Sequence, residues 1–247
     1  MIEVIPAILP KNYENLKNEI ALVRGVVPVV QVDICDGVFV KSITWPFLAA
    51  QKRPDLGNSK RSGLEEKNLD PHFERILNEQ EGMPFWEDVD FELDLMVRDS
   101  VENFDIYTKL GARRIIFHIE AVGNLEDFRN FLEGIDKYVR DSIEIGLAIN
   151  PATPFSELSP LIPSADFVQC MGNDKIGYHG VGLDEQVYEK IKTLRKKYPD
   201  LPIAVDIGVS TDTASLLVAA GATKLVAGSA IFNTDDIINT IEKFKNL

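Results

Sequence analysis

The stretch VVQVDICDGVFV, residues 29–40, carries the first indication of the fold of this chain. It is a run of β-branched residues that carries Asp33 inward and then breaks at the dipeptide Asp36-Gly37. Such a run predicts a buried strand that ends in a tight turn. A carboxylate at the end of a buried strand destabilises the fold unless it has a partner, a metal or a chemical task. Taken alone, the two aspartates need do no more than shape the turn, so the rest of the chain has to decide between these interpretations.

Strand-like and helix-like stretches alternate along the whole chain. Apolar runs predict eight strands, at residues 2–8, 28–33, 90–97, 113–118, 143–149, 166–171, 201–206 and 224–228. Helical spacing is found between them, at residues 13–24, 100–110, 125–139, 155–159, 184–198, 211–220 and 234–244, with the last helix capped near Asn233. Eight β-then-α units without a domain-sized linker predict one α/β domain over residues 1–247, a (β/α)8 TIM barrel. An open doubly wound sheet is the alternative, but no Gly-x-Gly-x-x-Gly follows the first strand.

Residues 48–89 interrupt this alternation between the second and third strands. The segment contains six Gly or Pro residues, and only residues 71–79 have a helical pattern. We expect an inserted segment, either a solvated elaboration or a lid over the C-terminal face, where barrel enzymes keep their chemistry. Its Gly, Ser and charged composition predicts high mobility around residues 55–66.

The composition is that of a globular protein. Of the 247 residues, 45% are hydrophobic and 26% charged, and no window approaches 18 consecutive apolar residues. The N-terminus has no basic region of the signal-peptide type, and Cys35 and Cys170 lack metal-type spacing, so we expect a reduced, cytoplasmic protein. The formal net charge of −13 argues against nonspecific binding to nucleic acid or acidic membranes. It does not argue against a phosphorylated ligand, because backbone N–H groups can bind phosphate.

Inward-pointing polar residues at the C-terminal ends of strands are the candidates for chemistry in a barrel. The sequence offers such a group: Gln31, Asp33, Asp94, His118, Asn150, Met171 with Gly172, Asp206, and Gly228 with Ser229. Three of these are carboxylates on separate strands, and like charges brought together destabilise a fold unless a cation or a proton lies between them. We therefore expect a functional cluster of Asp33, Asp94 and Asp206. For His118, a hydrogen-bonded core histidine and a substrate contact are equally good interpretations.

Six motifs resemble those of the ribulose-phosphate 3-epimerase family and occur in the family's order. They are DICDGVFV (33–40), FELDLMV (91–97), FHIEA (117–121), GLAINPATP (146–154), VDIGV (205–209) and VAGSAIF (226–232). The family's versions of the first two are Asp-x-Met-Asp-Gly-x-Phe-Val and Leu-Asp-Val-His-Leu-Met-Val, and the last motif matches without a change. The resemblance covers almost the whole chain outside residues 48–89 and implies a TIM barrel of the ribulose-phosphate-binding type.

The resemblance also implies an activity, the interconversion of ribulose 5-phosphate and xylulose 5-phosphate by inversion of the carbon next to the ketone. In the family, two aspartates on opposite faces of the substrate transfer the proton at C3, and they correspond to Asp33 and Asp206. A divalent metal stabilises the enediolate between the two steps. The family holds phosphate with backbone N–H groups near the last strands of the barrel. The expected substrate contacts here are Met96, Met171, Gly208, Gly228 and Ser229.

The metal site departs from the family pattern. The family holds its metal with two histidines and the two aspartates, but here the first histidine is Gln31 and the second is Asp94. The expected metal ligands are therefore Gln31, Asp33, Asp94 and Asp206. All of them offer oxygen, since glutamine can coordinate through its carbonyl, and oxygen ligands favour magnesium or manganese over zinc. The alternative is a site that binds no metal and has lost turnover.

The sequence thus predicts an epimerase acting on a carbohydrate of pentose phosphate metabolism. We expect a small phosphorylated sugar as the substrate, no nucleic-acid or membrane partner, and a homo-oligomer. Two alternatives stay open: an epimerase or isomerase of another phosphosugar, and a barrel that binds a phosphorylated ligand without turning it over. Retention of Asp33 and Asp206 favours an enzyme. The replacement of the family's substrate-contacting serine by Ala7 favours functional drift.

Overall fold

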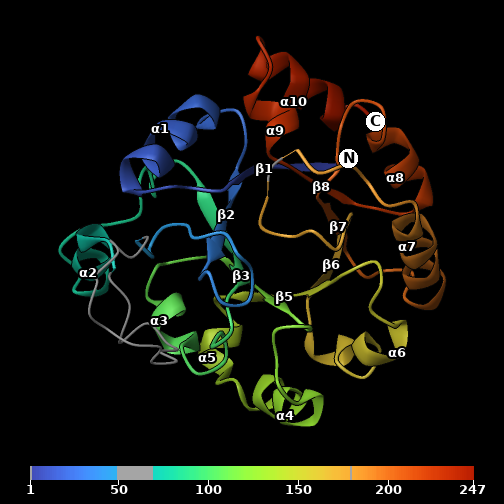
Figure 1. Cartoon of the computed structure of the whole chain (residues 1–247), viewed down its shortest axis with the longest axis horizontal. Helices are drawn as coiled ribbons and strands as arrows, with labels where there is room; N and C mark the ends of the chain where they lie inside the picture. The colour runs from blue at the N-terminus through green and yellow to red at the C-terminus, as the bar shows by residue number, and fades with distance from the viewer. Residues whose placement is uncertain (1, 49–68, 179) are drawn as a thin grey trace.

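Eight parallel strands close into a barrel in the computed structural model of the chain, which describes residues 2–48, 69–178 and 180–247 (Figure 1). The strands follow one another around the barrel in chain order. They are β1 Glu3–Ile8, β2 Val29–Cys35, β3 Asp90–Met96, β4 Arg114–His118, β5 Glu144–Ile149, β6 Phe167–Met171, β7 Ile203–Asp206 and β8 Lys224–Ala227. The predicted (β/α)8 barrel is confirmed, and the open doubly wound sheet is wrong because β1 pairs with β8.

Helices surround the strands on the outside of the barrel (Figure 1). They are α1 Tyr13–Val23, α2 Pro71–Leu77, α3 Phe104–Thr108, α4 Leu125–Gly134, α5 Lys137–Arg140, α6 Phe155–Leu158, α7 Gln186–Lys197, α8 Ala214–Ala220, α9 Ser229–Phe232 and α10 Ile237–Lys245, with a 3-10 turn at Ile162–Ser164. Their apolar faces pack on the outward side chains of the strands and form the larger of the two cores. Among the described residues, no helix combines the length and the apolarity needed to cross a membrane.

Several expected helix boundaries differ from those of the structure, and two of these errors arise from capping. The helix expected over residues 125–139 is two helices, because Ile135 is extended (φ −60°, ψ 128°) and the side chain of Asp136 caps a second helix by accepting from the N–H of Tyr138. The last helix is capped by Asp236, whose side chain accepts from the N–H of Asn239, and not near Asn233.

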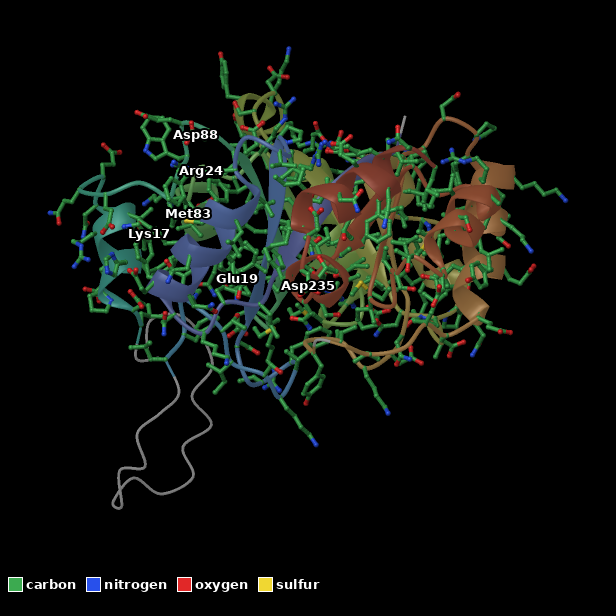
Figure 2. All side chains as sticks on the ribbon, turned by 90° about the horizontal axis from the view of Figure 1, so that it is seen from above. Lys17, Glu19, Arg24, Met83, Asp88 and Asp235 are labelled. Carbon is green, nitrogen blue, oxygen red and sulfur yellow. The ribbon has the colours of Figure 1, made fainter. Side chains whose placement is uncertain are left out.

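The described part of the inserted segment, residues 69–89, packs against α1. His72 of α2 stacks on Tyr13 with ring centroids 3.8 Å apart. Arg24, at the end of α1, forms an ion pair with Asp88 at 3.5 Å (Figure 2). Trp45 is fully buried just before this segment, whereas Trp86 within it is 62% exposed. The mobility expected around residues 55–66 concerns a stretch outside the described residues.

The barrel interior is built in layers, because alternate residues of each strand point inward. The lowest layer is ionic and consists of Arg114 with Glu92, Glu3 and Lys224. An apolar layer follows, with Ile5, Val29, Ile116, Phe167 and Val226 among its members. Phe167 occupies the centre because Gly146 leaves it room: a Cβ on Gly146 would lie 2.4 Å from Cζ of Phe167. This closed floor restricts access to the interior to its C-terminal end.

Candidate active site

Three aspartates meet above the apolar layer, at the C-terminal end of the barrel. Asp33 and Asp94 are register partners on the neighbouring strands β2 and β3, and Asp206 is the last residue of β7. One carboxylate oxygen of each lies within 4.8 Å of those of the other two. All three side chains are buried, and Asp94 has no exposed surface at all. The closure of the barrel thus brings together residues that are up to 173 positions apart in the sequence, from Asp33 to Asp206.

Gln31 joins two of these carboxylates. It precedes Asp33 by two positions on β2 and therefore points into the barrel from the same face. Its amide nitrogen donates to Oδ1 of Asp33 at 2.8 Å and to Oδ2 of Asp206 at 3.0 Å. Its amide oxygen, Oε1, is buried and finds no hydrogen-bond partner in the described part of the chain.

Asp94 is held by two other side chains. His118, the last residue of β4, lies with Nε2 2.8 Å from Oδ1 of Asp94, and the amide nitrogen of Gln169 on β6 donates to Oδ2 at 3.3 Å. Both His118 and Gln169 are fully buried. His118 is therefore a core histidine with a carboxylate partner. Gln169 was not expected from the sequence, although the alternation of inward residues that ends at Met171 could have identified it.

Burial and mutual repulsion shift the acidity of this cluster. Burial raises the pKa of Asp33 well above its ordinary range, and the charges of Asp206 and Asp94 raise it further. Burial and the charge of Asp94 raise the pKa of Asp206 to about 7, although the hydrogen bond from Gln31 acts in the opposite direction. A carboxyl group with a pKa close to the working pH can both accept and donate a proton.

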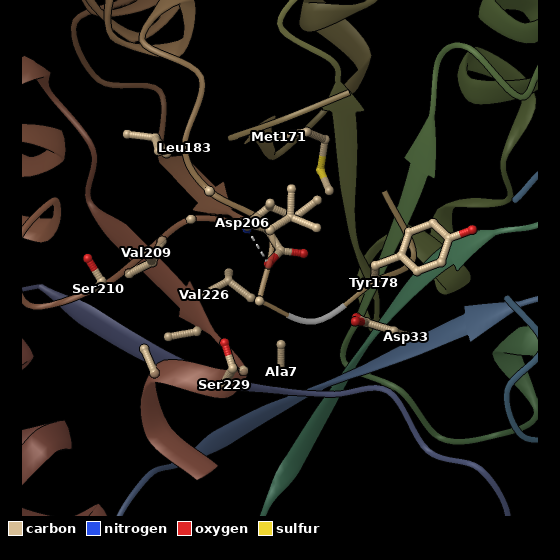
Figure 3. Close-up of a pocket in the computed structure, with 18 of the residues that line it drawn as sticks. Ala7, Asp33, Met171, Tyr178, Leu183, Asp206, Val209, Ser210, Val226 and Ser229 are labelled. Carbon is tan, nitrogen blue, oxygen red and sulfur yellow. Dashed lines mark hydrogen bonds between the residues drawn. The ribbon is translucent and has the colours of Figure 1, made fainter. Parts of the chain in front are cut away.

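A cavity of about 470 Å³ opens above the carboxylates (Figure 3). Asp33 and Asp206 are directed into it, and the side chains of Ala7, Met96 and Met171 form apolar wall beside them. Gln31 and Asp94 do not line the cavity and lie beneath it. Two of the three carboxylates can therefore reach a ligand directly.

The far end of the cavity is formed by the segments that follow β7 and β8. The expected residues Gly208, Gly228 and Ser229 line it. Ser210, Thr213 and Asn233 also line it, and these were not expected from the sequence. None of the described lining residues is a lysine or an arginine. An anion at this end would therefore be bound by main-chain N–H and hydroxyl groups.

Close backbone packing shapes this end of the cavity. Gly208 has φ +74°, and a Cβ on it would lie 2.7 Å from the backbone nitrogen of Leu183. The N–H of Gly172 donates to the carbonyl of Asp206 at 2.6 Å, which joins the loops after β6 and β7. Ile207 has a left-handed backbone with φ 71°. A β-branched residue is strained in that region, so the turn is maintained by its surroundings.

The loop after β6 covers part of the cavity. Gly177 and Tyr178 line it, and the hydroxyl of Ser42 donates to the carbonyl of Gly177 at 2.5 Å. Tyr178 is 47% exposed and stands at the cavity mouth (Figure 3).

The carboxylate cluster has the chemistry of a divalent cation site. Three carboxylate oxygens converge from three strands. Gln31 presents its amide nitrogen to two of these residues, and its buried Oε1, which has no partner among the described residues, is the oxygen it could offer to a cation after rotation of the amide. Hard cations such as magnesium and manganese prefer oxygen ligands. Nε2 of His118, an imidazole nitrogen of the described residues, is occupied by Asp94. The donors present therefore fit a hard cation.

Comparison with known proteins decides the family. The sequence profile of the ribulose-phosphate 3-epimerase family matches residues 76–232, which is more than half of the chain. The chain belongs to the ribulose-phosphate 3-epimerase family. It is 28% identical to ribulose-phosphate 3-epimerase of Bacillus subtilis, with 99% of each chain covered. It is 27% identical to the cytoplasmic isoform from Oryza sativa subsp. japonica, with 98% of this chain and 93% of that one covered. The resemblance found in the motifs is confirmed, and the protein is a carbohydrate epimerase.

More distant solved structures share the fold. The 3-hexulose-6-phosphate synthase of Salmonella typhimurium superposes with a TM-score of 0.64 at 14% identity, covering 99% of this chain and 97% of that one. KGPDC from Streptococcus mutans gives a TM-score of 0.66 at 13% identity, covering 99% and 96%. At these identities the likeness concerns the barrel alone.

Proposed function

We propose that this family member interconverts ribulose 5-phosphate and xylulose 5-phosphate by proton transfer at C3. The observation that carries the proposal is the entry of Asp33 and Asp206 into one cavity from β2 and β7, two strands that β8 and β1 separate around the barrel. Two carboxyl groups that approach from different strands can address opposite faces of a substrate held between them. The curated relatives named above carry this activity in their names.

Inversion at C3 needs a base on one face and an acid on the other. One aspartate accepts the C3 proton, the electrons of the C–H bond move into the C2–C3 bond, and the C2 oxygen takes up the negative charge. The other aspartate, protonated beforehand, donates to the opposite face of C3 while the carbonyl re-forms. The pKa of Asp206, raised to about 7, and the raised pKa of Asp33 support this exchange, because burial and mutual repulsion favour the protonated form that an acid needs.

The charge that develops on the C2 oxygen has to be stabilised. A divalent cation held by Gln31, Asp33, Asp94 and Asp206 would supply positive charge for this purpose, and the all-oxygen donors favour magnesium or manganese over zinc. The protein's own part is to fix the two aspartates. Gln31 contributes to this, since its amide nitrogen bonds both of them.

The rest of the cavity suits a short phosphorylated sugar. We propose that Gly208, Gly228 and Ser229 bind the phosphate through main-chain N–H groups, at the end that lacks cationic side chains. Met96 and Met171 would pack against the carbon chain beside the carboxylates. A sulfate or phosphate ion bound at another corner in soaked crystals, with this one left empty, would contradict the phosphate assignment.

The test is deuterium incorporation at C3 of ribulose 5-phosphate in deuterated water, followed by NMR. The protein is first treated with a chelator and then supplied with magnesium, manganese or zinc. We expect exchange with manganese or magnesium, and a loss of roughly 10²-fold or more in Asp33→Asn and in Asp206→Asn, because each removes one acid–base group. Asp174→Asn is the matched control, since Asp174 is an exposed carboxylate after β6 that does not line the cavity.

The outcomes separate the alternatives. Deuterium exchange at the wild-type rate in either aspartate variant would contradict the two-base mechanism. Faster exchange with zinc than with magnesium or manganese would contradict the proposal that the oxygen ligands favour a hard cation. Faster exchange with another ketose phosphate would favour the alternative phosphosugar. Binding of phosphosugar without exchange under any metal would leave a barrel that binds a phosphorylated ligand only.

A further inference from the structure

Asp94 differs from the other two carboxylates of the cluster in how it is held. It has no exposed surface and does not line the cavity. Its two oxygens are bonded from two other strands: Oδ1 lies 2.8 Å from Nε2 of His118, and Oδ2 accepts from the amide nitrogen of Gln169 at 3.3 Å. Since β4 adjoins β3 whereas β6 is three strands away around the barrel, the carboxylate is held from two directions.

His118 and Gln169 have little else to bond. In the described part of the structure, Nδ1 of His118 and Oε1 of Gln169 are buried without a hydrogen-bond partner. The imidazole ring has Phe39 beside it at 5.7 Å between ring centroids, and the Gln169 amide has only the sulfur of Met171 as a second neighbour, at 3.7 Å. A buried polar side chain destabilises the fold unless its hydrogen bonds compensate. Both side chains are therefore directed at Asp94.

We propose that His118 and Gln169 are positioning residues that keep Asp94 turned toward Asp33 and Asp206, so that the three carboxylates bind one divalent cation. The inference rests on the cation site included in the proposed function. Neither residue lines the cavity, so neither acts on the substrate directly.

The physical reason is the instability of an unsupported cluster. Three carboxylates with oxygens within 4.8 Å of one another repel, and a free Asp94 would lower this repulsion by rotating away. A donor on each oxygen opposes that rotation, and each oxygen keeps a further lone pair for a cation. Ligating carboxylates in metal sites are commonly held by such outer hydrogen bonds, and the loss of one typically lowers metal affinity roughly 10–100-fold. Gln31 gives the same support to the other two carboxylates.

The test measures binding of manganese to the metal-free protein, with the EPR signal of free Mn²⁺ as the readout. We expect His118→Leu to raise the dissociation constant roughly 10–100-fold, and Gln169→Met to raise it less because its hydrogen bond is longer. His118→Gln places an amide donor near the position of Nε2 and is expected to restore most of the affinity. This rescue would not occur if the imidazole only filled space.

A control variant separates positioning from general destabilisation. Leu217→Ala removes a fully buried side chain from α8, far from the cluster, and should lower the thermal midpoint without changing Mn²⁺ affinity. If His118→Leu does not fold, the Mn²⁺ affinity of the nearly isosteric Gln169→Met still tests the inference. Unchanged Mn²⁺ affinity in the folded variants would overturn the inference, as would a wild-type protein that binds no Mn²⁺. Mn²⁺ binding without C3 exchange would instead contradict the proposed function and leave this inference standing.

Discussion

Glu92 lies two residues before Asp94 on β3, on the N-terminal side of the carboxylate cluster, with no exposed surface. Its Oε2 accepts from Arg114 at 3.1 Å, while its Oε1 has no hydrogen-bond partner among the described residues. Arg114 also donates hydrogen bonds to the carboxylates of Glu3 and Glu144. Burial raises the pKa of Glu92 to about 7, although the nearby charges of Arg114 and Lys224 lower it. The ionised form of Glu92 is thus poorly compensated at this site.

Replacing Glu92 should change how stability depends on pH. Because the pKa of Glu92 is higher in the folded chain than its ordinary value of 4.5, the folded state binds this proton more tightly than the unfolded state. Its contribution to stability is therefore complete below pH 4.5 and is lost as the pH rises to about 7. As the pH rises from 5 to 7.5, the unfolding free energy of Glu92→Gln should increase by roughly 1–3 kcal/mol relative to that of wild type. Urea unfolding at both pH values measures this difference.

Glu144→Gln is the control, since Glu144 bonds the same arginine but is 39% exposed. The difference in unfolding free energy between this control and wild type should stay nearly constant over the same pH interval. Parallel pH profiles for Glu92→Gln and wild type would show that Glu92 is adequately paired as an ion.

At the scale of elements, α2 packs against α1 through His72 and Tyr13 and against Trp45 through Phe73. Phe73 of α2 is fully buried and meets Trp45 edge to face at 5.8 Å. Glu81, just beyond α2, lies 2.9 Å from Nδ1 of His72 and accepts from Arg75 at 2.9 Å. Burial disfavours the charged form of Glu81, but these hydrogen bonds outweigh it and lower its pKa to about 2.

The lowered pKa of Glu81 predicts acid sensitivity of this docking. A carboxyl with a depressed folded-state pKa contributes stability above its ordinary value of 4.5, and that contribution is lost as the pH falls from 4.5 toward 2. Because Glu81 is partly solvated, we expect Glu81→Gln to lower the unfolding free energy by only about 1 kcal/mol at pH 7 and by less near pH 3. Urea unfolding at both pH values measures this. Glu74→Gln, an exposed glutamate on α2, should have no such effect, and an equal loss in both variants would contradict the assignment.

At the scale of the whole molecule, the protein combines a strongly negative charge with a cavity for an anion. The formal net charge is −13, and the described lining of the cavity contains two aspartates and no cationic side chain. A phosphorylated sugar therefore approaches against the overall field of the protein. Under the proposed function, short-range interactions inside the cavity would have to outweigh this repulsion.

This charge distribution predicts that added salt raises kcat/KM for the phosphosugar. Raising KCl from about 10 to 150 mM shortens the screening length from roughly 30 to 8 Å, so repulsion during approach should weaken. We expect kcat/KM for the phosphosugar to rise roughly two- to fivefold while kcat stays constant. Steady-state kinetics at matched osmolality, with sucrose replacing the salt in the control, measure the effect. A fall in kcat/KM with salt would mean that a local positive field guides the substrate.

The barrel, its eight strands and most of the polar residues at their C-terminal ends could be predicted from the sequence. This was possible because hydrophobic residues repeat every two residues in a strand and about every 3.6 residues in a helix, so that a short window shows the pattern. Turn-forming residues such as Asp36 and Gly37 mark where a strand ends. The sequence also placed Asp33, Asp94 and Asp206 at one end, since all parallel strands of a barrel end on the same face. Where it failed, at Ile135 and Asn233, the ends of helices were decided by capping geometry within one turn.

Only the tertiary structure decided which inward side chains meet. The period of a strand shows that Gln31, Gln169 and His118 point into the barrel, but not that they hold carboxylates on other strands. The partner of Gln169 is 75 positions away and one partner of Gln31 is 175 away. Those meetings depend on the closure and stagger of the whole barrel, to which every strand contributes. The pKa shifts follow from the same closure, because burial and the proximity of charges do not exist until the ring is complete.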